Sequence, residues 1–246
     1  MKTEIFKYPD TNSSRAGISD LNSKFEGLKI AIIGLGGTGS YILDLISKTN
    51  IEEIHIYDGD VFQVHNAFRA PGACGIDGFG TESSIMKVEY YSEIYSRMRN
   101  GIEAHPIYVD ESNINEFSLY DFVFISVDSN AVRSFITKAL LELKTSFIDV
   151  GMGVKRNEND LLGTIRVTVA TPESNSHLQH RIGSDEMVEN EYASNIQIVE
   201  LNCLNATLAV IRWKKIIGFY QDLKGEFNNL YFINTGKMLN EDFPRV

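Results

Sequence analysis

The sequence predicts an α/β protein: a single domain with a Rossmann-like, doubly wound and mostly parallel sheet, and an antiparallel extension at its C-terminal end. An apolar, β-branched run at 28–33 precedes the glycine-rich turn 34–39, and an amphipathic run at 40–48 follows it. A second apolar run, 54–57, ends in Asp58. This succession of strand, glycine turn, helix, strand and acid is typical of the nucleotide-binding start of such a sheet.

The glycine turn itself predicts an anion site. Glycines let the backbone approach a phosphate closely, and the first N–H groups of the following helix are free to bind the anion. Asp58, at the end of the second strand, is placed to bind ribose hydroxyls. The alternative is a tight turn that only packs the helix against the sheet. The glycines expected at the nucleotide are Gly34, Gly36, Gly37 and Gly39.

A second cluster of polar residues follows Asp58 and favours ATP over a dinucleotide as the ligand. Asn66 and Arg69 are three residues apart, so on a helix both side chains can face one site. Lys87 opens a helix-like run at 87–98. Cations of this kind neutralise phosphates. Two alternatives are that Asn66 only caps its turn and that Lys87 is a surface lysine.

A carboxylate for a metal ion follows the next strand. The apolar run 122–127 ends in Asp128, and Arg133 lies one turn into the helix that should follow. Magnesium prefers oxygen ligands, so Asp128 suits a magnesium ion that accompanies the triphosphate. The alternative for Asp128 is a helix N-cap. We expect Arg133 to be structural and to pair with a nearby acid.

Together these positions resemble the ThiF-like adenylyltransferases, the superfamily of ubiquitin-activating enzymes and of the thiamine and molybdopterin biosynthesis activators. The residues come in the family's order, although the stretch between Arg69 and Lys87 is a few residues longer. The resemblance runs from about Arg15 to about Gly236. Local phrases at 65–73 and 200–206 resemble bacterial members found beside ubiquitin-like, conjugating-enzyme-like and JAB-type peptidase genes, in systems associated with antiphage defence. The matching residues are the Gly34–Gly39 turn, Asp58, Asp60, Asn66, Arg69, Lys87 and Asp128.

The resemblance implies a role for each polar residue. Asp58 would hold the ribose, with Asp60 beside it in the ATP site, and Asp128 would bind magnesium. The phosphates would be contacted by Asn66, Arg69 and Lys87. In this family an arginine near the N-terminus reaches into the partner subunit's ATP site, and Arg15 is the candidate. Residues 1–27 would then be an arm for dimer contact, residues 28–246 the adenylation domain, and the protein a homodimer. The alternative for Arg15 is a solvated side chain.

The second half is less regular. We expect a strand at 146–153 that runs into a glycine turn, an antiparallel or edge strand at 163–169, and an exposed crossover loop at 171–194. A long amphipathic helix at 195–219 and a strand at 230–233 follow. The apolar face predicted for that helix consists of Ile196, Val199, Leu204, Leu208, Ile211 and Ile216.

In the family the crossover segment often carries a cysteine that accepts the activated protein as a thioester, and here 171–194 has none. We expect Cys203 to pack in the core and Cys74 to be a poor nucleophile. There is no pair of Cys-x-x-Cys motifs, so we expect no zinc site. His177 and His180 are expected to be solvated. The adenylate would pass directly to a conjugating partner or to a serine of the loop: Ser174, Ser176, Ser184 or Ser194.

Composition narrows the partners and the compartment. The 246 residues are 43% hydrophobic, with no run of 18 apolar residues and no apolar signal region at the N-terminus, so we expect no membrane span. Two distant cysteines indicate a reducing cytoplasm rather than a disulfide framework. The net charge of −10 argues against a nucleic-acid partner and suits a partner with a basic face.

The expected chemistry is carboxylate activation. ATP and magnesium are the expected cofactors, and the substrate implied by the family is the glycine-ended tail of a ubiquitin-like protein. The carboxylate would attack the α-phosphate, giving an acyl adenylate and pyrophosphate for transfer to a conjugating-enzyme-like protein. The alternatives are adenylation of a small peptide or sulfur-carrier protein, an NAD-dependent oxidoreductase, and a non-catalytic dimer scaffold.

Overall fold

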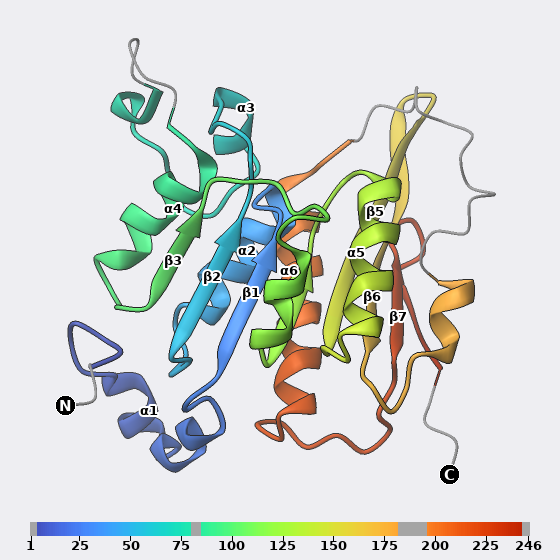
Figure 1. The fold of residues 1–246 in the computed structure, drawn as a ribbon. Coiled ribbons are helices and arrows are strands. Elements are labelled where there is room, and N and C mark those ends of the chain that lie inside the picture. Colours follow the sequence, from blue (N-terminus) through green and yellow to red (C-terminus); the bar gives the residue numbers. More distant parts are fainter. Residues whose placement is uncertain (1–3, 80–84, 182–195, 243–246) are drawn as a thin grey trace.

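The computed structural model describes residues 4–79, 85–181 and 196–242, and these build one eight-stranded sheet with helices on both faces (Figure 1). The strand order is β3-β2-β1-β4-β5-β6-β7-β8. This arrangement confirms the predicted fold class. The strands are β1 (Lys29–Ile33), β2 (Glu53–Tyr57), β3 (Ile102–His105), β4 (Phe122–Ile125), β5 (Phe147–Asn157), β6 (Asp160–Ala170), β7 (Asn228–Phe232) and β8 (Lys237–Glu241).

The first five strands are parallel and the last three are antiparallel. β1 pairs with both β2 and β4, so the connection after β2 and β3 returns to the middle of the sheet. Ligands bind where the strand order reverses in this way, at the carboxyl ends of the strands. From β5 onward the sheet continues through hairpins to β8. The switch point therefore lies between β1 and β4.

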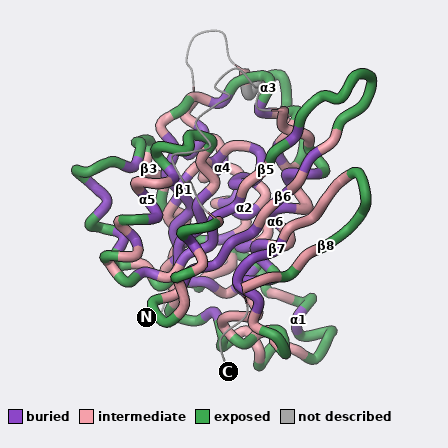
Figure 2. Tube along the Cα trace, turned by 90° about the vertical axis from the view of Figure 1, so that its right-hand side faces the viewer, coloured by how far each residue is buried: buried purple, intermediate pink, exposed green. Residues whose placement is uncertain are grey.

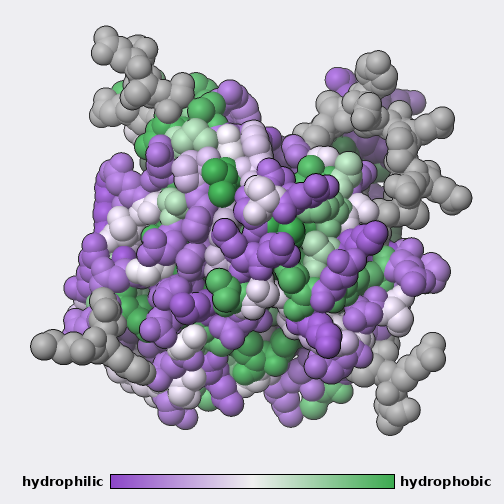
Figure 3. All heavy atoms as spheres, in the orientation of Figure 1, coloured by the Kyte–Doolittle hydropathy of each residue, from purple (hydrophilic) through white to green (hydrophobic). Residues whose placement is uncertain are grey.

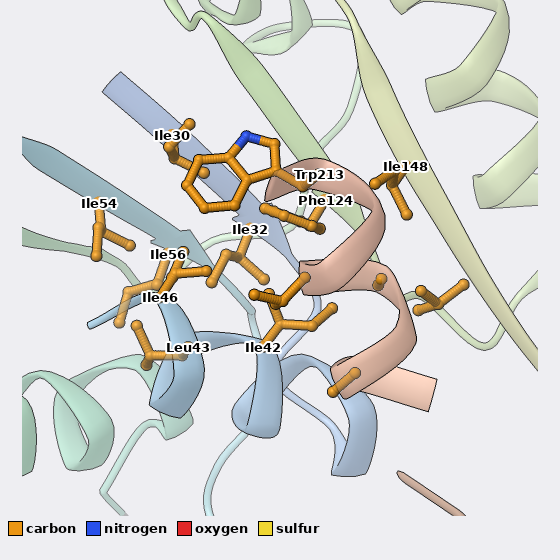
Figure 4. Close-up of a cluster of buried hydrophobic side chains, with 14 of the residues drawn as sticks. Ile30, Ile32, Ile42, Leu43, Ile46, Ile54, Ile56, Phe124, Ile148 and Trp213 are labelled. Carbon is orange, nitrogen blue, oxygen red and sulfur yellow. The ribbon is translucent and has the colours of Figure 1, made fainter. Parts of the chain in front are cut away.

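Helices cover the two faces of the sheet unequally. On one face lie α2 (Gly37–Ile46), α4 (Lys87–Ser96) and α6 (Val199–Ile216), and the other is covered by α5 (Asn130–Glu142) with the 3₁₀ helix η3 (Ile114–Leu119). Figure 4 shows Trp213 of α6 beside Phe124 and isoleucines of β1 and β2 on the first face. The remaining helices are short: α1 (Thr11–Ala16), η1 (Ser19–Lys24), α3 (Val64–Ala67), η2 (Ile76–Phe79) and η4 (Ser176–His180).

Burial on both faces explains the uninterrupted apolar run at 30–33 within β1. Ile30 and Ile32 belong to the core under α2 and α6, whereas Ala31 and Ile33 belong to the core under α5. A parallel strand covered on both sides has no polar face, so its sequence does not alternate. Figure 2 shows the buried residues gathered along the strands and the exposed ones at the loops and hairpin tips.

The glycine turn expected at the end of the strand 146–153 was wrong. Gly151 and Gly153 do not form a turn but lie inside β5, opposite Arg166 and Thr164 of β6. The reversal comes later, near Glu158, whose φ of 52° is left-handed. Of the two alternatives for the strand at 163–169, the antiparallel one is confirmed, since β6 pairs antiparallel with both β5 and β7, and for the same reason β6 is not an edge strand. The antiparallel β8 was not predicted at all; its residues are mostly exposed.

The helix at 195–219 is shorter than expected, and its buried face differs from the predicted one. Val199 and Ile211, assigned to the apolar face, are each 39% exposed. Its fully or nearly buried positions include the polar Asn202 and Asn205. A hydrophobic pattern could not identify a buried face that carries polar side chains. The buried apolar residues of α6 are Leu201, Ala206, Ala209, Val210 and Trp213.

The surface in the view of Figure 3 is mostly hydrophilic, with apolar residues in scattered groups. Among the residues described, no helix combines the length and hydropathy needed to cross a membrane. Of the crossover loop expected at 171–194, the structure describes 171–181, which includes η4 with Leu178 buried. Ser184 and Ser194 lie outside the described residues.

Candidate nucleotide and substrate site

The glycine turn packs so tightly that backbone atoms exclude a side chain from two of its positions. Gly34 has a φ of +88°, and a Cβ there would lie 2.5 Å from the carbonyl oxygen of Ser126 at the end of β4. A Cβ on Gly39 would lie 1.9 Å from the Gly34 oxygen. Around Gly36, in contrast, nothing lies within 4 Å of an added Cβ. Glycine is therefore required at Gly34 and Gly39 for close packing, whereas Gly36, the N-cap of α2, is open to a ligand.

Asp58 ties the end of β2 to this turn. Its carboxylate is 8% exposed and accepts hydrogen bonds from the N–H groups of Leu35, at 2.7 Å, and Asp60, at 2.8 Å. These bonds fix the acid beside the glycines, where the sequence placed the ribose-binding residue. One carboxylate thus orients both the turn and the loop that follows β2.

Lys87 is buried, which excludes the alternative of a surface lysine. It opens α4, is 6% exposed, and its Nζ lies 2.6 Å from Asp60 Oδ2 and 3.4 Å from both oxygens of Asp58. Burial alone would raise the pKa of Asp60, but the hydrogen bonds from Lys87 and from the Tyr108 hydroxyl outweigh it and lower that pKa below its ordinary value. The charged groups of Lys87, Asp58 and Asp60 are therefore held close together in a partly desolvated site.

Asn66 and Arg69 lie on and just after α3, on the wall of the same cavity. Asn66 is 3% exposed, and its Oδ1 accepts from the Gln63 N–H at 2.8 Å, so it does cap its turn. Capping uses its oxygen and leaves the amide group available. The Nε of Arg69 is buried and has no partner among the described residues. A buried donor without a partner is costly, so Arg69 is prepared for an acceptor.

Asp128 is exposed and is not the N-cap of α5. The cap is Ser129, whose Oγ accepts from the Val132 N–H at 3.4 Å. Arg133 is structural, as expected: its Nε lies 2.9 Å from Oδ1 of the fully buried Asp149. Among the described residues no three His, Cys, Asp or Glu side chains cluster as a metal site. A magnesium ion at Asp128 would therefore take its other oxygen ligands from phosphates and water, which suits this ion.

These side chains meet in one cavity of about 620 Å³ at the carboxyl ends of the central strands. The loop after β3 supplies Tyr108, which sequence reasoning missed; nothing in its local pattern marked it. Of the predicted nucleotide glycines, Gly34 and Gly36 line this cavity, and Gly37 does not. The predicted residues on its wall are Gly34, Gly36, Asp58, Asp60, Asn66, Arg69, Lys87 and Asp128.

A second cavity, of about 640 Å³, adjoins the first. It extends over β5 and β6 between the N-terminal ends of α2 and α5 and the start of α6. Its floor includes the two glycines of β5, and its walls carry Arg166 and the buried amides Asn202 and Asn205. Both cavities are lined by Gly36, Ser126, Val127, Asp128 and Gln197.

Arg15 does not belong to the nucleotide cavity of its own chain. It is exposed on α1, and α1 lies at the opposite end of the sheet from α3 (Figure 1). The two cysteines are also outside both cavities. Cys203 is half-buried rather than packed in the core, and Cys74 is half-buried too.

Comparison with known proteins agrees with this arrangement. The model of the ThiF family matches residues 13–186. The ubiquitin-like modifier-activating enzyme 5 of Dictyostelium discoideum is 26% identical over 164 residues, covering 63% of this chain and 42% of the relative. The SUMO-activating enzyme subunit uba-2 of Caenorhabditis elegans is 22% identical over 125 residues, covering 51% and 21%. The chain thus spans less than half the length of these curated relatives.

Solved structures share the fold at low identity. The crystal structure of E. coli MccB with ATP superposes with a TM-score of 0.72 at 16% identity, covering 98% of this chain and 74% of that one. E. coli MccB with selenomethionine-labelled MccA gives 0.72 at 15% identity, covering 98% and 73%. The structure of PaaA gives 0.64 at 15% identity, covering 100% and 77%. At this identity the likeness shows the fold alone.

Proposed function

The chain belongs to the ThiF family, and from this premise we propose that it is an adenylyltransferase that uses ATP to activate the carboxyl terminus of a ubiquitin-like protein. The observation that carries the proposal is the meeting of two cavities at Gly36 and Asp128. One cavity has a glycine turn, a ribose acid and two cations for a nucleotide. The other is lined by residues 150–154 of β5 and suits the end of a chain.

The step needs alignment and charge neutralisation more than covalent chemistry. A carboxylate oxygen of the substrate forms a bond to the α-phosphorus of ATP while the bond from that phosphorus to the bridging oxygen breaks, and pyrophosphate leaves with the electron pair. The products are the acyl adenylate and pyrophosphate, and no proton is transferred because the carboxylate is already ionised. Lys87 and Arg69 neutralise the phosphate charge, and magnesium bound at Asp128 would supply further neutralisation.

The relatives support a protein as the substrate. Both curated relatives carry names of enzymes that activate protein modifiers. A small peptide or a sulfur-carrier protein is the second candidate, since the cavity along β5 would take any extended chain end. We propose that neither cysteine carries the activated protein, because neither lines a cavity, and that the adenylate passes to a conjugating-enzyme-like partner in a reducing cytoplasm. A role in antiphage defence is part of this proposal.

We further propose a homodimer in which Arg15 of one protomer completes the nucleotide site of the other. The placement of α1 far from the nucleotide cavity of its own chain supports this, since Arg15 is too distant to act within one chain. Arginine suits such a role because its guanidinium stays charged and binds phosphates in a fixed geometry.

The test is ATP–pyrophosphate exchange with phosphorus-32 label. We expect exchange that requires magnesium and a ubiquitin-like protein with a free carboxyl terminus. The same protein with its terminal carboxylate converted to an amide is the matched control and should support none. Exchange that proceeds equally without the partner, or with the amide form, would contradict the proposal.

A further inference from the structure

The Asp60 carboxylate is shared between two side chains on the wall of the nucleotide cavity. Its Oδ2 lies 2.6 Å from Nζ of Lys87, and its Oδ1 accepts a hydrogen bond from the Tyr108 hydroxyl at 2.5 Å. The Asp60 side chain is 51% exposed. A side chain with this exposure has rotamer freedom to lose, and a partner on each oxygen restricts it to one position.

Tyr108 is itself fixed by the backbone around it. Its ring lies on Gly59, where an added Cβ would be 2.7 Å from two ring carbons. A side chain at Gly59 would therefore push the ring away from the neighbouring Asp60. The Tyr108 carbonyl accepts from the amide of Asn113 at 2.8 Å, and Asn113 is 8% exposed. The phenol thus meets Asp60 from a braced loop, although Tyr108 is 65% exposed.

The carboxylate of Asp58 has few acceptor positions left for a ligand. A carboxylate offers about four lone-pair positions, two on each oxygen. In Asp58, Oδ2 accepts from the Leu35 N–H and Oδ1 accepts from the Asp60 N–H. One position remains on each oxygen, and this matches the two hydroxyl groups of a ribose.

Lys87 is the group that competes for those positions. Its Nζ lies 3.4 Å from both oxygens of Asp58, against 2.6 Å from Asp60. Lys87 is 6% exposed, and a buried ammonium group needs a close acceptor. In the described part of the chain, Asp58 carries the only other carboxylate within 4 Å of this ammonium group. The contact with Asp60 therefore keeps Lys87 off the acid expected to bind the ribose.

We infer that Tyr108 is a positioning residue that determines the selectivity of the nucleotide site for a ribose. It acts through Asp60, which holds Lys87 away from Asp58. Both remaining positions of Asp58 are then open to the ribose hydroxyls. This inference rests on the proposed function, because it concerns how the same site recognises ATP.

The measurement is the ratio of the affinities for ATP and for 2′,3′-dideoxy-ATP, each determined by isothermal titration calorimetry with magnesium. The two nucleotides share their base and phosphates, so the ratio isolates the contribution of the two hydroxyl groups. We expect the wild-type protein to bind ATP at least about tenfold more tightly, because hydrogen bonds to a charged carboxylate are worth that much or more.

Tyr108→Phe keeps the ring on Gly59 and removes only the hydroxyl. It should lower the affinity ratio about fivefold, with the affinity for the dideoxynucleotide within about twofold of wild type. The unchanged second affinity also shows that the variant is folded. The matched control is Tyr8→Phe, which removes the hydroxyl of an exposed tyrosine outside both cavities and should leave the ratio unchanged.

A double-mutant cycle tests whether Tyr108 acts through Asp60. Asp60→Ala should lower the ratio at least as much as Tyr108→Phe, because it removes the acid that holds Lys87. Adding Tyr108→Phe to Asp60→Ala should lower it no further, since the partner of the hydroxyl is already gone. A direct contact between Tyr108 and the nucleotide would instead lower the ratio in both backgrounds.

Three results would overturn the inference: an unchanged ratio in Tyr108→Phe, an equal loss from Tyr108→Phe with and without Asp60, or a wild-type ratio near one. In each case ATP–pyrophosphate exchange would continue, so the proposed function would stand. Failure of exchange with every carboxylate substrate would contradict the proposed function, and the binding ratios would still decide the inference.

Discussion

The Nζ atom of Lys87 lies 2.6 Å from a carboxylate oxygen of Asp60, and this contact joins the first residue of α4 to the loop after β2. The same ammonium group lies 3.4 Å from the buried carboxylate of Asp58, which accepts the Leu35 N–H of the glycine turn. Three segments that are distant in the sequence are thereby held around one cation. The lysine is fixed in direction before any phosphate binds, which is what electrostatic preorganisation requires.

Loss of this cation should impair chemistry far more than it impairs folding. Lys87→Met should lower kcat/KM for ATP–pyrophosphate exchange by roughly 10²–10³-fold, the usual scale for one preorganised contact. The matched control is Lys48→Met, because Lys48 is exposed and pairs with Asp44 on the surface of α2. It should stay within about twofold of wild type. A rate for Lys87→Met equal to that of the control would return Lys87 to a structural role.

Asp60 should titrate below its ordinary range, and Tyr108 should contribute to this. The hydrogen bonds from Lys87 and Tyr108 favour the charged carboxylate, so the pKa in the folded protein lies below the ordinary 3.8. Carbon-13 NMR of the Asp60 carboxyl should show this midpoint, and Tyr108→Phe should raise it because one donor is lost. Equal midpoints in the two proteins would show that the hydroxyl does not act on Asp60.

The lowered pKa of Asp60 also determines how this residue makes the stability of the fold depend on pH. A depressed pKa means that the stabilisation is present above pH 3.8 and is lost as the pH falls through the folded-state pKa. Because the Asp60 side chain is 51% exposed, its contribution should stay below about 1 kcal/mol.

Removal of the Asp149 carboxylate, which holds the two arginines at the second cavity, should strongly destabilise the folded protein. It is fully buried and pairs with both Arg133 and Arg166, so one carboxylate serves two guanidinium groups. Asp149→Ala would leave those charges facing each other and should cost about 3–5 kcal/mol of unfolding free energy in urea. Asp160→Ala, at the exposed tip of the same hairpin, should cost less than about 0.5 kcal/mol. Similar losses for the two variants would contradict this account of the cluster.

Complementation tests the proposed crossing of Arg15. An Arg15→Ala chain and an Asp128→Asn chain should each be inactive alone, because each lacks one residue of every site. Mixed dimers contain one intact site, so mixing equal amounts should restore roughly a quarter of the wild-type rate if the chains form two-fold dimers. The matched control is a chain that carries Arg97→Ala instead of Arg15→Ala. This substitution breaks only an exposed ion pair with Glu93, so the control chain should be active without mixing. Absence of rescue in a dimeric protein would argue against the crossing arginine.

The first half of the fold could be predicted because its signals are local. The glycine turn, the apolar run of β1 and the acid after β2 each follow from one short segment, and parallel strands carry their functional residues at one edge. Lys87 and Asp128 were predicted for the same reason, since each begins or ends an element at that edge. Because parallel strands bring these ends to one edge of the sheet, Lys87 and Asp128 line the same cavity.

The second half depended on contacts that no local pattern contains. Gly151 and Gly153 indicated a turn, but the long hairpin with β6 extends through both of them. Asn202 and Asn205 were hidden on the buried side of α6, because a hydrophobic pattern assigns polar residues to solvent. Tyr108 lies in a loop, and its position on the cavity wall, with a hydrogen bond to Asp60, appears only in the folded structure.

The most direct measurement of the central claim is the fate of oxygen-18 placed in both oxygens of the terminal carboxylate of the ubiquitin-like protein that supports exchange. If the carboxylate attacks the α-phosphorus, cleavage of the adenylate at its acyl carbon leaves that oxygen on AMP. Mass spectrometry of the released AMP should therefore find one heavy oxygen per molecule in the wild type, with pyrophosphate unlabelled. AMP without the label, or ADP as the product, would contradict adenylation of the carboxyl terminus.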